Sequence, residues 1–226
     1  MSHEAAAASA PRRWVLIVLA CLAIGGLAFA IGRFSTFGVS ASASAPANDS
    51  AEAGFARDMQ VHHGQAVEMA MQIYRTTDDT ELRTLAYDIA TGQSAQRGEM
   101  FDWLVQWGLP QAGAPLMSWM ADTQGAHGEH EGTSGEPVDD AALRASMGMA
   151  TDAELTELRA ATGDAADCLF LELMIRHHEG AIPMAEAVLE RGSEPRVLAV
   201  ATSMKNAQAA EIGAMESIQQ RVGCSG

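Results

Sequence analysis

Apolar and polar positions alternate with the period of an α-helix in two separate stretches of the chain. In the first stretch the pattern predicts a helix over about 51–75 and another over about 79–107, separated by the polar residues 76–79. Gly108 and Pro110 come directly after the second helix and are typical of a helix end. This stretch therefore predicts a helix hairpin.

The second stretch predicts a matching hairpin. A helix is expected over about 164–191, and Gly192 is expected to end it as a left-handed cap. Pro195 suits the first turn of a further helix, which continues to about Val222. Two hairpins bring four apolar stripes together, so we expect an all-α fold with a four-helix bundle over 51–223.

A long connector, residues 109–163, joins hairpin 51–108 to hairpin 164–223. Its middle is polar and rich in glycine, which favours a loop. Thr151 and Glu154 have the spacing of a capping box, and this predicts a short helix in the second half of the connector.

The two hairpins are near-copies of each other in sequence. Residues 55–70 recur as 170–185, an offset of 115 that stays constant without a gap as far as Met100 and Met215. Both copies contain a His-His pair flanked by methionines. A repeat of this kind predicts two structurally equivalent units.

Both His-His pairs are predicted to face the interior of the bundle. On a helix, each pair shares an arc of about 120° with the apolar positions around it, which is the width of a core-facing stripe. Alanines one turn later leave space near the rings. The positions on this arc are Phe55, Met59, His62, His63, Ala66, Met69 and Ala70 in the first copy, and Phe170, Met174, His177, His178, Ala181, Met184 and Ala185 in the second.

A buried imidazole needs a partner, because desolvation without a hydrogen bond costs roughly 1–3 kcal/mol. A metal ion can be that partner, and imidazole combined with thioether suits copper, with thioethers favouring Cu(I). The alternative is packing, with the histidines bonded to a neighbouring helix and the methionines filling the core. The predicted ligands for Cu(I) or Cu(II) are His62, His63, His177, His178, Met59, Met69, Met174 and Met184.

The second helix of each hairpin presents a matching polar face. Gln93 and its counterpart Gln208 are predicted to hydrogen-bond the second ring nitrogen of a ligating histidine, and Glu211 lies on the same face. A polar contact between helices is the alternative role for these side chains. An inward-facing Glu-x-x-His motif is missing from the sequence, which disfavours an oxygen-rich diiron centre.

The N-terminus carries an apolar segment close to the length that spans a bilayer. Residues 14–32 are predicted to form a single transmembrane anchor after a cytoplasmic segment 1–13, followed by a flexible linker over 33–50. A cleaved signal peptide is the alternative, and it would make the protein secreted. Either arrangement places the helical domain outside the cytoplasm, where a disulfide between Cys168 and Cys224 can persist.

The formal net charge of −15 disfavours nucleic acid and anionic lipid as partners, because both would repel such a surface. The partners expected are a metal ion and, through the anchor, the cytoplasmic membrane. A second copy of the chain or a copper-handling protein is left open.

The pattern Phe-x3-Met-x2-His-His-x2-Ala-x2-Met-Ala, followed by Gln-x6-Met and by the connector segment 147–150, resembles the domain-of-unknown-function family 305. The resemblance covers about residues 51–222. It implies a ferritin-like four-helix bundle in exported or membrane-anchored bacterial proteins, some of them linked to copper binding and copper tolerance. It also implies a metal-binding role for the eight His and Met positions named above.

The leading functional hypothesis is a copper-binding protein that sequesters or transfers the metal. A copper-dependent redox enzyme is one alternative, and a structural or partner-binding bundle without metal is another. The sequence shows no nucleophile with a matching base, no phosphate loop and no paired catalytic carboxylates, so enzymatic activity is not the first expectation.

Overall fold

The computed structural model describes residues 45–121 and 139–224, and these residues form six α-helices, one short 3-10 helix and no strand. The fold is therefore all-helical, as predicted. The expected membrane segment 14–32 lies outside the described residues. None of the helices within them is both long enough and apolar enough to cross a membrane.

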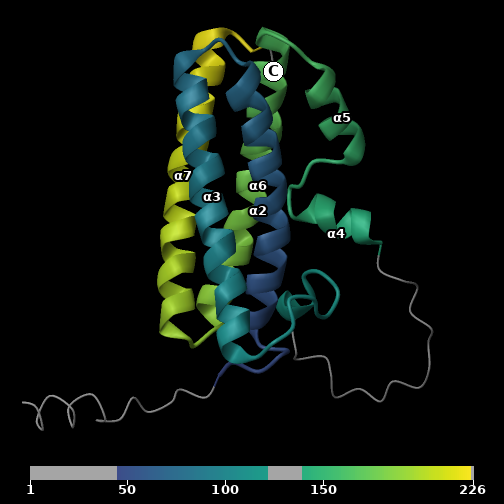
Figure 1. Cartoon of the computed structure of the whole chain (residues 1–226), viewed down its shortest axis with the longest axis vertical. Helices are drawn as coiled ribbons and strands as arrows, with labels where there is room; N and C mark the ends of the chain where they lie inside the picture. The colour runs from purple at the N-terminus through teal and green to yellow at the C-terminus, as the bar shows by residue number, and fades with distance from the viewer. Residues whose placement is uncertain (1–44, 122–138, 225–226) are drawn as a thin grey trace, which may run out of the picture. The chain divides into compact units, whose positions relative to one another are not determined.

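Four long helices pack side by side as two hairpins (Figure 1). The helices of the first hairpin, α2 and α3, span Ala51–Thr76 and Thr80–Trp107. Those of the second, α6 and α7, span Asp164–Arg191 and Pro195–Val222. These bounds differ from the predicted ones by at most one residue at each end, and α2 packs against α6 to join the hairpins.

The helix ends follow local rules of capping. The side chains of Ser50, Asp79 and Glu194 accept hydrogen bonds from backbone N–H groups in the first turns of α2, α3 and α7. Gly108 ends α3 in the left-handed conformation, with φ at 68°.

The prediction of a left-handed cap at Gly192 is wrong. Its backbone is extended, with φ at −83° and ψ at 165°, because only a short link separates it from Pro195 at the start of α7. Glycine fits here for a different reason. A Cβ atom at this position would lie 2.7 Å from the carbonyl oxygen of Val188.

The described part of the connector contains three short helices: η1 over Ser118–Met120, α4 over Asp140–Ser146 and α5 over Asp152–Ala160. The predicted capping box at the start of α5 is confirmed, with Thr151 and Glu154 bonding each other's backbone N–H groups. Helix α5 contacts both α2 and α6, so the connector crosses the face where the two hairpins meet (Figure 1).

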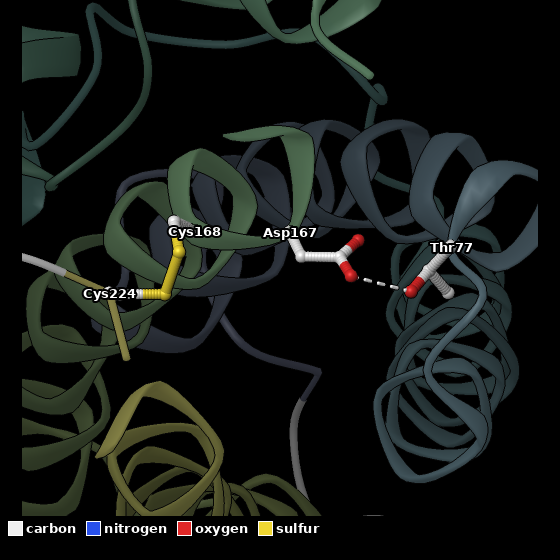
Figure 2. The surroundings of a disulfide bond; sticks show 4 residues. All are labelled: Thr77, Asp167, Cys168 and Cys224. Carbon is white, nitrogen blue, oxygen red and sulfur yellow. Dashed lines mark hydrogen bonds between the residues drawn. A yellow bond between two sulfur atoms is a disulfide. The ribbon is translucent and has the colours of Figure 1, made fainter. Parts of the chain in front are cut away.

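A pair of equivalent acids ties each hairpin to the loop of the other. Asp167, in the first turn of α6, accepts a 2.9 Å hydrogen bond from the hydroxyl of Thr77 between α2 and α3 (Figure 2). Glu52, the equivalent residue in α2, accepts bonds of 2.6 and 3.2 Å from the backbone N–H groups of Ser193 and Glu194 between α6 and α7. The repeat is therefore visible in the contacts between the hairpins as well as in the sequence.

Cys168 and Cys224 form a disulfide, the pairing expected from the sequence (Figure 2). Their Cα atoms are 5.4 Å apart, because the start of α6 lies beside the end of α7 in the antiparallel hairpin. The bond closes the whole second hairpin, with a sequence separation of 56 residues.

Replacing both cysteines, Cys168→Ser and Cys224→Ser, should lower the free energy of unfolding by about 4 kcal/mol, because the bond removes conformational entropy from the unfolded chain. Urea unfolding of the helical domain measures this difference. The wild-type domain reduced with a thiol reductant serves as a second comparison and should approach the double variant. Equal unfolding midpoints for all three samples would contradict the assignment of a stabilising role to this bond.

Candidate metal centre

The two His-His pairs lie at the middle of α2 and α6, and all four side chains have 0 % exposure. The prediction that they face the core is confirmed. The rings of His62 and His177 meet where the hairpins touch, with centroids 3.7 Å apart and planes inclined by 34°. His63 and His178 lie to either side, each about 6 Å from its neighbour in the pair, with centroid separations of 6.3 and 6.2 Å.

The central rings use their Nε2 atoms to bond backbone oxygens. Nε2 of His62 lies 2.9 Å from the carbonyl oxygen of Met147 in the connector. Nε2 of His177 lies 3.1 Å from the carbonyl oxygen of His62. A carbonyl oxygen only accepts, so Nε2 must carry the proton in both rings.

The outer rings bond equivalent side chains on α3 and α7. Nε2 of His63 lies 2.7 Å from the amide oxygen of Gln96, and Nε2 of His178 lies 2.6 Å from a carboxylate oxygen of Glu211. Gln96 and Glu211 are related by the same offset of 115 residues. Both oxygens accept, so these two rings also carry their proton on Nε2.

The polar partner in the first hairpin is thus Gln96, whereas the sequence prediction assigned this role to Gln93. The side chain of Gln93 is buried, and neither of its polar atoms has a hydrogen-bond partner among the residues described. Gln208 is the equivalent buried residue, and its amide oxygen is likewise unpartnered. Glu211 does contact a histidine, as the prediction allowed. The alignment of Gln96 with Glu211 was the signal that could have identified the pair.

The Nδ1 atoms of all four histidines are buried and have no hydrogen-bond partner within residues 45–121 and 139–224. Because Nε2 holds the proton, each Nδ1 carries a free lone pair. Metal-binding histidines commonly have this arrangement, in which one nitrogen donates to a carbonyl or carboxylate while the other binds the metal. The four rings are therefore prepared as nitrogen donors.

Burial also favours the uncharged form of His62, His63 and His177. Desolvation, together with the nearby rings, lowers the pKa of His62 to about 4 and that of His63 to about 3, despite hydrogen bonds that oppose the shift. The same causes hold the pKa of His177 well below 6.5. The neutral imidazole is the form that binds a metal, so protons do not compete for the nitrogens of His62, His63 and His177 near neutral pH.

Methionines lie beyond the histidines in both directions along the bundle. Met59 and Met184 belong to one buried cluster, and Met69 and Met174 belong to the other. The first methionine of each motif thus shares a cluster with the second methionine of the other copy, because α2 and α6 run antiparallel. All four side chains are 0 or 1 % exposed.

No group of three or more His, Cys, Asp or Glu side chains in the described part of the chain is arranged to hold a metal ion. The four buried histidines are covered by this statement, so no three of them form such a group in the described structure, and a site built mainly from carboxylates is likewise absent there. The donors present near the centre of the bundle are imidazoles and thioethers. This donor set fits soft or borderline metals, with Cu(I) favoured by thioether and copper in general by imidazole.

The fold and the duplicated histidine motif define a class of helical proteins. Comparison with known protein families identifies the same class. The profile of the family described as "Domain of unknown function (DUF305)" matches residues 52–219. The chain belongs to this family, and the resemblance noted in the sequence is confirmed.

Solved structures of the same family resemble this one. A DUF305 protein from Streptomyces coelicolor is 41 % identical, with 79 % of this chain and 96 % of the other covered and a TM-score of 0.66. A DUF305 fragment from Deinococcus radiodurans is 30 % identical, with 76 % and 96 % covered and a TM-score of 0.61. CopM in its Cu(II)-bound form is 26 % identical, with 76 % and 97 % covered and a TM-score of 0.55. A search of curated proteins finds no match.

The metal-free protein should lose stability as the pH falls below about 6.5. The unfolded chain binds protons on its histidines there, whereas the folded chain does not until the pH nears 4 for His62 and 3 for His63. The stabilising effect is complete above pH 6.5, and its loss reaches at most about 1.4 kcal/mol per pH unit for each histidine. Urea unfolding between pH 7.5 and 5 measures it.

A His177→Leu variant is the matched comparison, because it removes one of the titrating rings and should give a shallower pH dependence. A wild-type free energy of unfolding that stays constant from pH 7.5 to 5 would contradict the buried, neutral state of these rings.

Proposed function

We propose that this protein binds copper inside the bundle and thereby sequesters the metal or passes it on. The ligands would be the Nδ1 atoms of the paired histidines, supplemented by thioether sulfurs from the methionines beyond them. The full ligand set proposed is His62, His63, His177, His178, Met59, Met69, Met174 and Met184.

The four unpartnered Nδ1 atoms are the observation that carries this proposal. Leaving one buried polar atom without a hydrogen bond costs roughly 1–3 kcal/mol, and here the cost recurs at equivalent positions of both copies. A packing role alone gives no reason to leave the same atom unpartnered four times. A metal bound at either pair would use lone pairs that are otherwise unpartnered.

The relationship to CopM supports copper as the metal. That protein has been crystallised with Cu(II), and it covers three quarters of this chain at 26 % identity. Copper bound here would gain a site shielded from water by the bundle core. The chain itself would contribute the fixed orientation of the rings, since each Nε2–H is bonded to an oxygen that prevents the ring from turning.

We also propose that the domain acts outside the cytoplasm, held at the cell membrane by residues 14–32. Two features support this location. The N-terminal sequence has the length and apolarity of a membrane anchor. The Cys168–Cys224 disulfide is of a kind that persists in oxidising compartments.

Titration of the exported domain with Cu(I), and with Ag(I) as a redox-inert substitute, tests the proposal. Wild type should bind both metals, whereas a variant with all four histidines changed to alanine should bind neither above background. Two half-variants, His62→Ala/His63→Ala and His177→Ala/His178→Ala, decide the number of sites. If the pairs share one site, each half-variant should lose nearly all binding; if they form two sites, each should keep half the stoichiometry.

Circular dichroism and unfolding measurements on each variant show whether it is folded. Equal binding by folded wild type and a folded four-histidine variant would contradict the proposal. It would leave the histidines with a structural role only. The methionine ligands are tested separately by Met59→Leu/Met184→Leu, which keeps the volume of the core while removing two sulfurs.

A further inference from the structure

A short connector segment crosses both histidine helices directly beside the rings. It consists of Met147, Gly148, Met149 and Ala150 between α4 and α5, and it is called the strap below. Its side chains are buried, with Met147 at 0 %, Met149 at 4 % and Ala150 at 5 % exposure. A loop segment buried to this extent must have its backbone polar groups bonded by neighbouring elements.

On the side of α2, the strap is bonded at two places. The amide of Gln65 donates to the carbonyl oxygen of Ala150 at 2.8 Å and accepts from its N–H at 2.7 Å. One turn earlier in α2, Nε2–H of His62 donates to the carbonyl oxygen of Met147 at 2.9 Å. Within the described residues, the Met147 carbonyl is the hydrogen-bond partner of Nε2 of His62, and Gln65 fixes where that partner lies.

On the side of α6, the strap fits only because two glycines are present. A Cβ atom on Gly180 would lie 2.0 Å from the Met147 carbonyl oxygen, which is too close for any real contact. Gly148 has φ at 71°, and a Cβ atom there would lie 2.2 Å from the carbonyl oxygen of Arg176. The backbone of the strap thus touches the backbone of α6.

An ion pair just after the strap holds the start of α5 against α6. Glu154, in the first turn of α5, forms a two-pronged ion pair with Arg176, with both oxygen–nitrogen distances at 2.8 Å. Both anchoring residues are close to a histidine pair in the sequence. Arg176 directly precedes His177 in α6, and Gln65 lies two residues after His63 in α2. The strap is therefore anchored to both histidine helices next to their rings.

Gln65 and Gly180, which both meet the strap, occupy equivalent positions in the repeat, separated by the same 115 residues as the histidines. Within the otherwise similar motif they have opposite properties. One is a long amide that reaches out to bond the strap, and the other has no side chain and so makes room for it. A single strap cannot meet two equivalent helices in the same way, which explains this difference between the copies.

We propose that Gln65, Gly148 and Gly180 are positioning residues for the His62 ring, acting through the strap. By holding the Met147 carbonyl at Nε2, they fix His62 in the Nε2–H form and leave Nδ1 as its only lone pair for metal. The consequence for metal binding rests on the function proposed above. The consequence for the ring itself does not, because it is a property of the metal-free protein.

Gly180→Ala tests the proposal directly. Alanine favours helix more than glycine does, so α6 should still form, while the added methyl group pushes the Met147 carbonyl away from His62. The matched control is Gly213→Ala in α7, where a Cβ atom would meet nothing within 4 Å. Long-range ¹H–¹⁵N NMR of the histidine rings, without metal, reports which nitrogen carries the proton.

In wild type and in Gly213→Ala, all four rings should be protonated on Nε2. In Gly180→Ala, only His62 should change, to a mixture of the Nε2–H and Nδ1–H tautomers. His178, whose partner is Glu211, should keep its wild-type signal. Affinity for Ag(I) should fall about tenfold or more in Gly180→Ala, the size of effect seen when a partner of a ligating histidine is removed. An unchanged His62 signal in folded Gly180→Ala would overturn the proposal.

A second variant covers the case in which Gly180→Ala does not fold. Gln65→Leu removes two hydrogen bonds to the strap and adds no atom beside α6. Its control is Gln60→Leu, a half-buried glutamine on the same helix that bonds Ala56 and Gln111 instead. Gln65→Leu should show the same selective change at His62, and a wild-type His62 signal there would again overturn the proposal.

The two readouts separate the two proposals. If wild type fails to bind silver or copper, the metal function is wrong, but the NMR result still decides whether the strap sets the protonation of His62. If wild type binds metal and neither strap variant alters His62, the strap has a packing role only.

Discussion

Four imidazole rings lie without solvent exposure in the middle of this bundle, and each donates one N–H group to an oxygen. This is the constraint on which the surrounding structure depends, because a buried ring with no partner for that group would destabilise the fold. The acceptors come from three sources: a connector carbonyl, a helix carbonyl, and one side chain on each of α3 and α7. Removing any of them leaves a buried donor unsatisfied. Nδ1 of each ring has no hydrogen-bond partner among the residues described. The proposed metal binding uses this second nitrogen.

The duplication explains most of the architecture around this centre. Equivalent residues make equivalent contacts at several levels, from the acids that hold the hairpin loops to the outer partners Gln96 and Glu211. The strap breaks the equivalence, since one connector cannot contact both copies in the same way. His62 bonds the strap, whereas His177 bonds the backbone of His62. The two halves of the centre therefore differ in their supports while they share the same donor atoms.

Much of the fold could be predicted from the sequence because it depends on local patterns. Helical periodicity and capping residues gave helix bounds within one residue, and the burial of the histidines followed from their position on the apolar stripe. The pairing of Cys168 with Cys224 followed from an antiparallel hairpin together with an oxidising compartment. These inferences needed only the geometry of single helices and the order of elements.

The contacts between elements were less accessible to sequence reasoning. Gln93 and Gln96 share one face of α3, and only the relative placement of two helices selects Gln96 as the partner of His63. The sequence pattern includes segment 147–150, but a backbone carbonyl such as that of Met147 carries no residue-specific signal, so its contact with His62 could not be predicted. Gly192 was assigned the right position but the wrong conformation, because glycine serves both positive φ and close backbone approach.

The most direct test of the central claim is a crystal structure of the copper-loaded domain with anomalous scattering measured at the copper edge. Copper is expected within the bundle, bonded at about 2 Å to Nδ1 of at least one histidine from the repeated pairs, with the Nε2 hydrogen bonds retained. Copper found only on the surface, or bonded to Nε2 after loss of the Met147, Gln96 or Glu211 contacts, would contradict it.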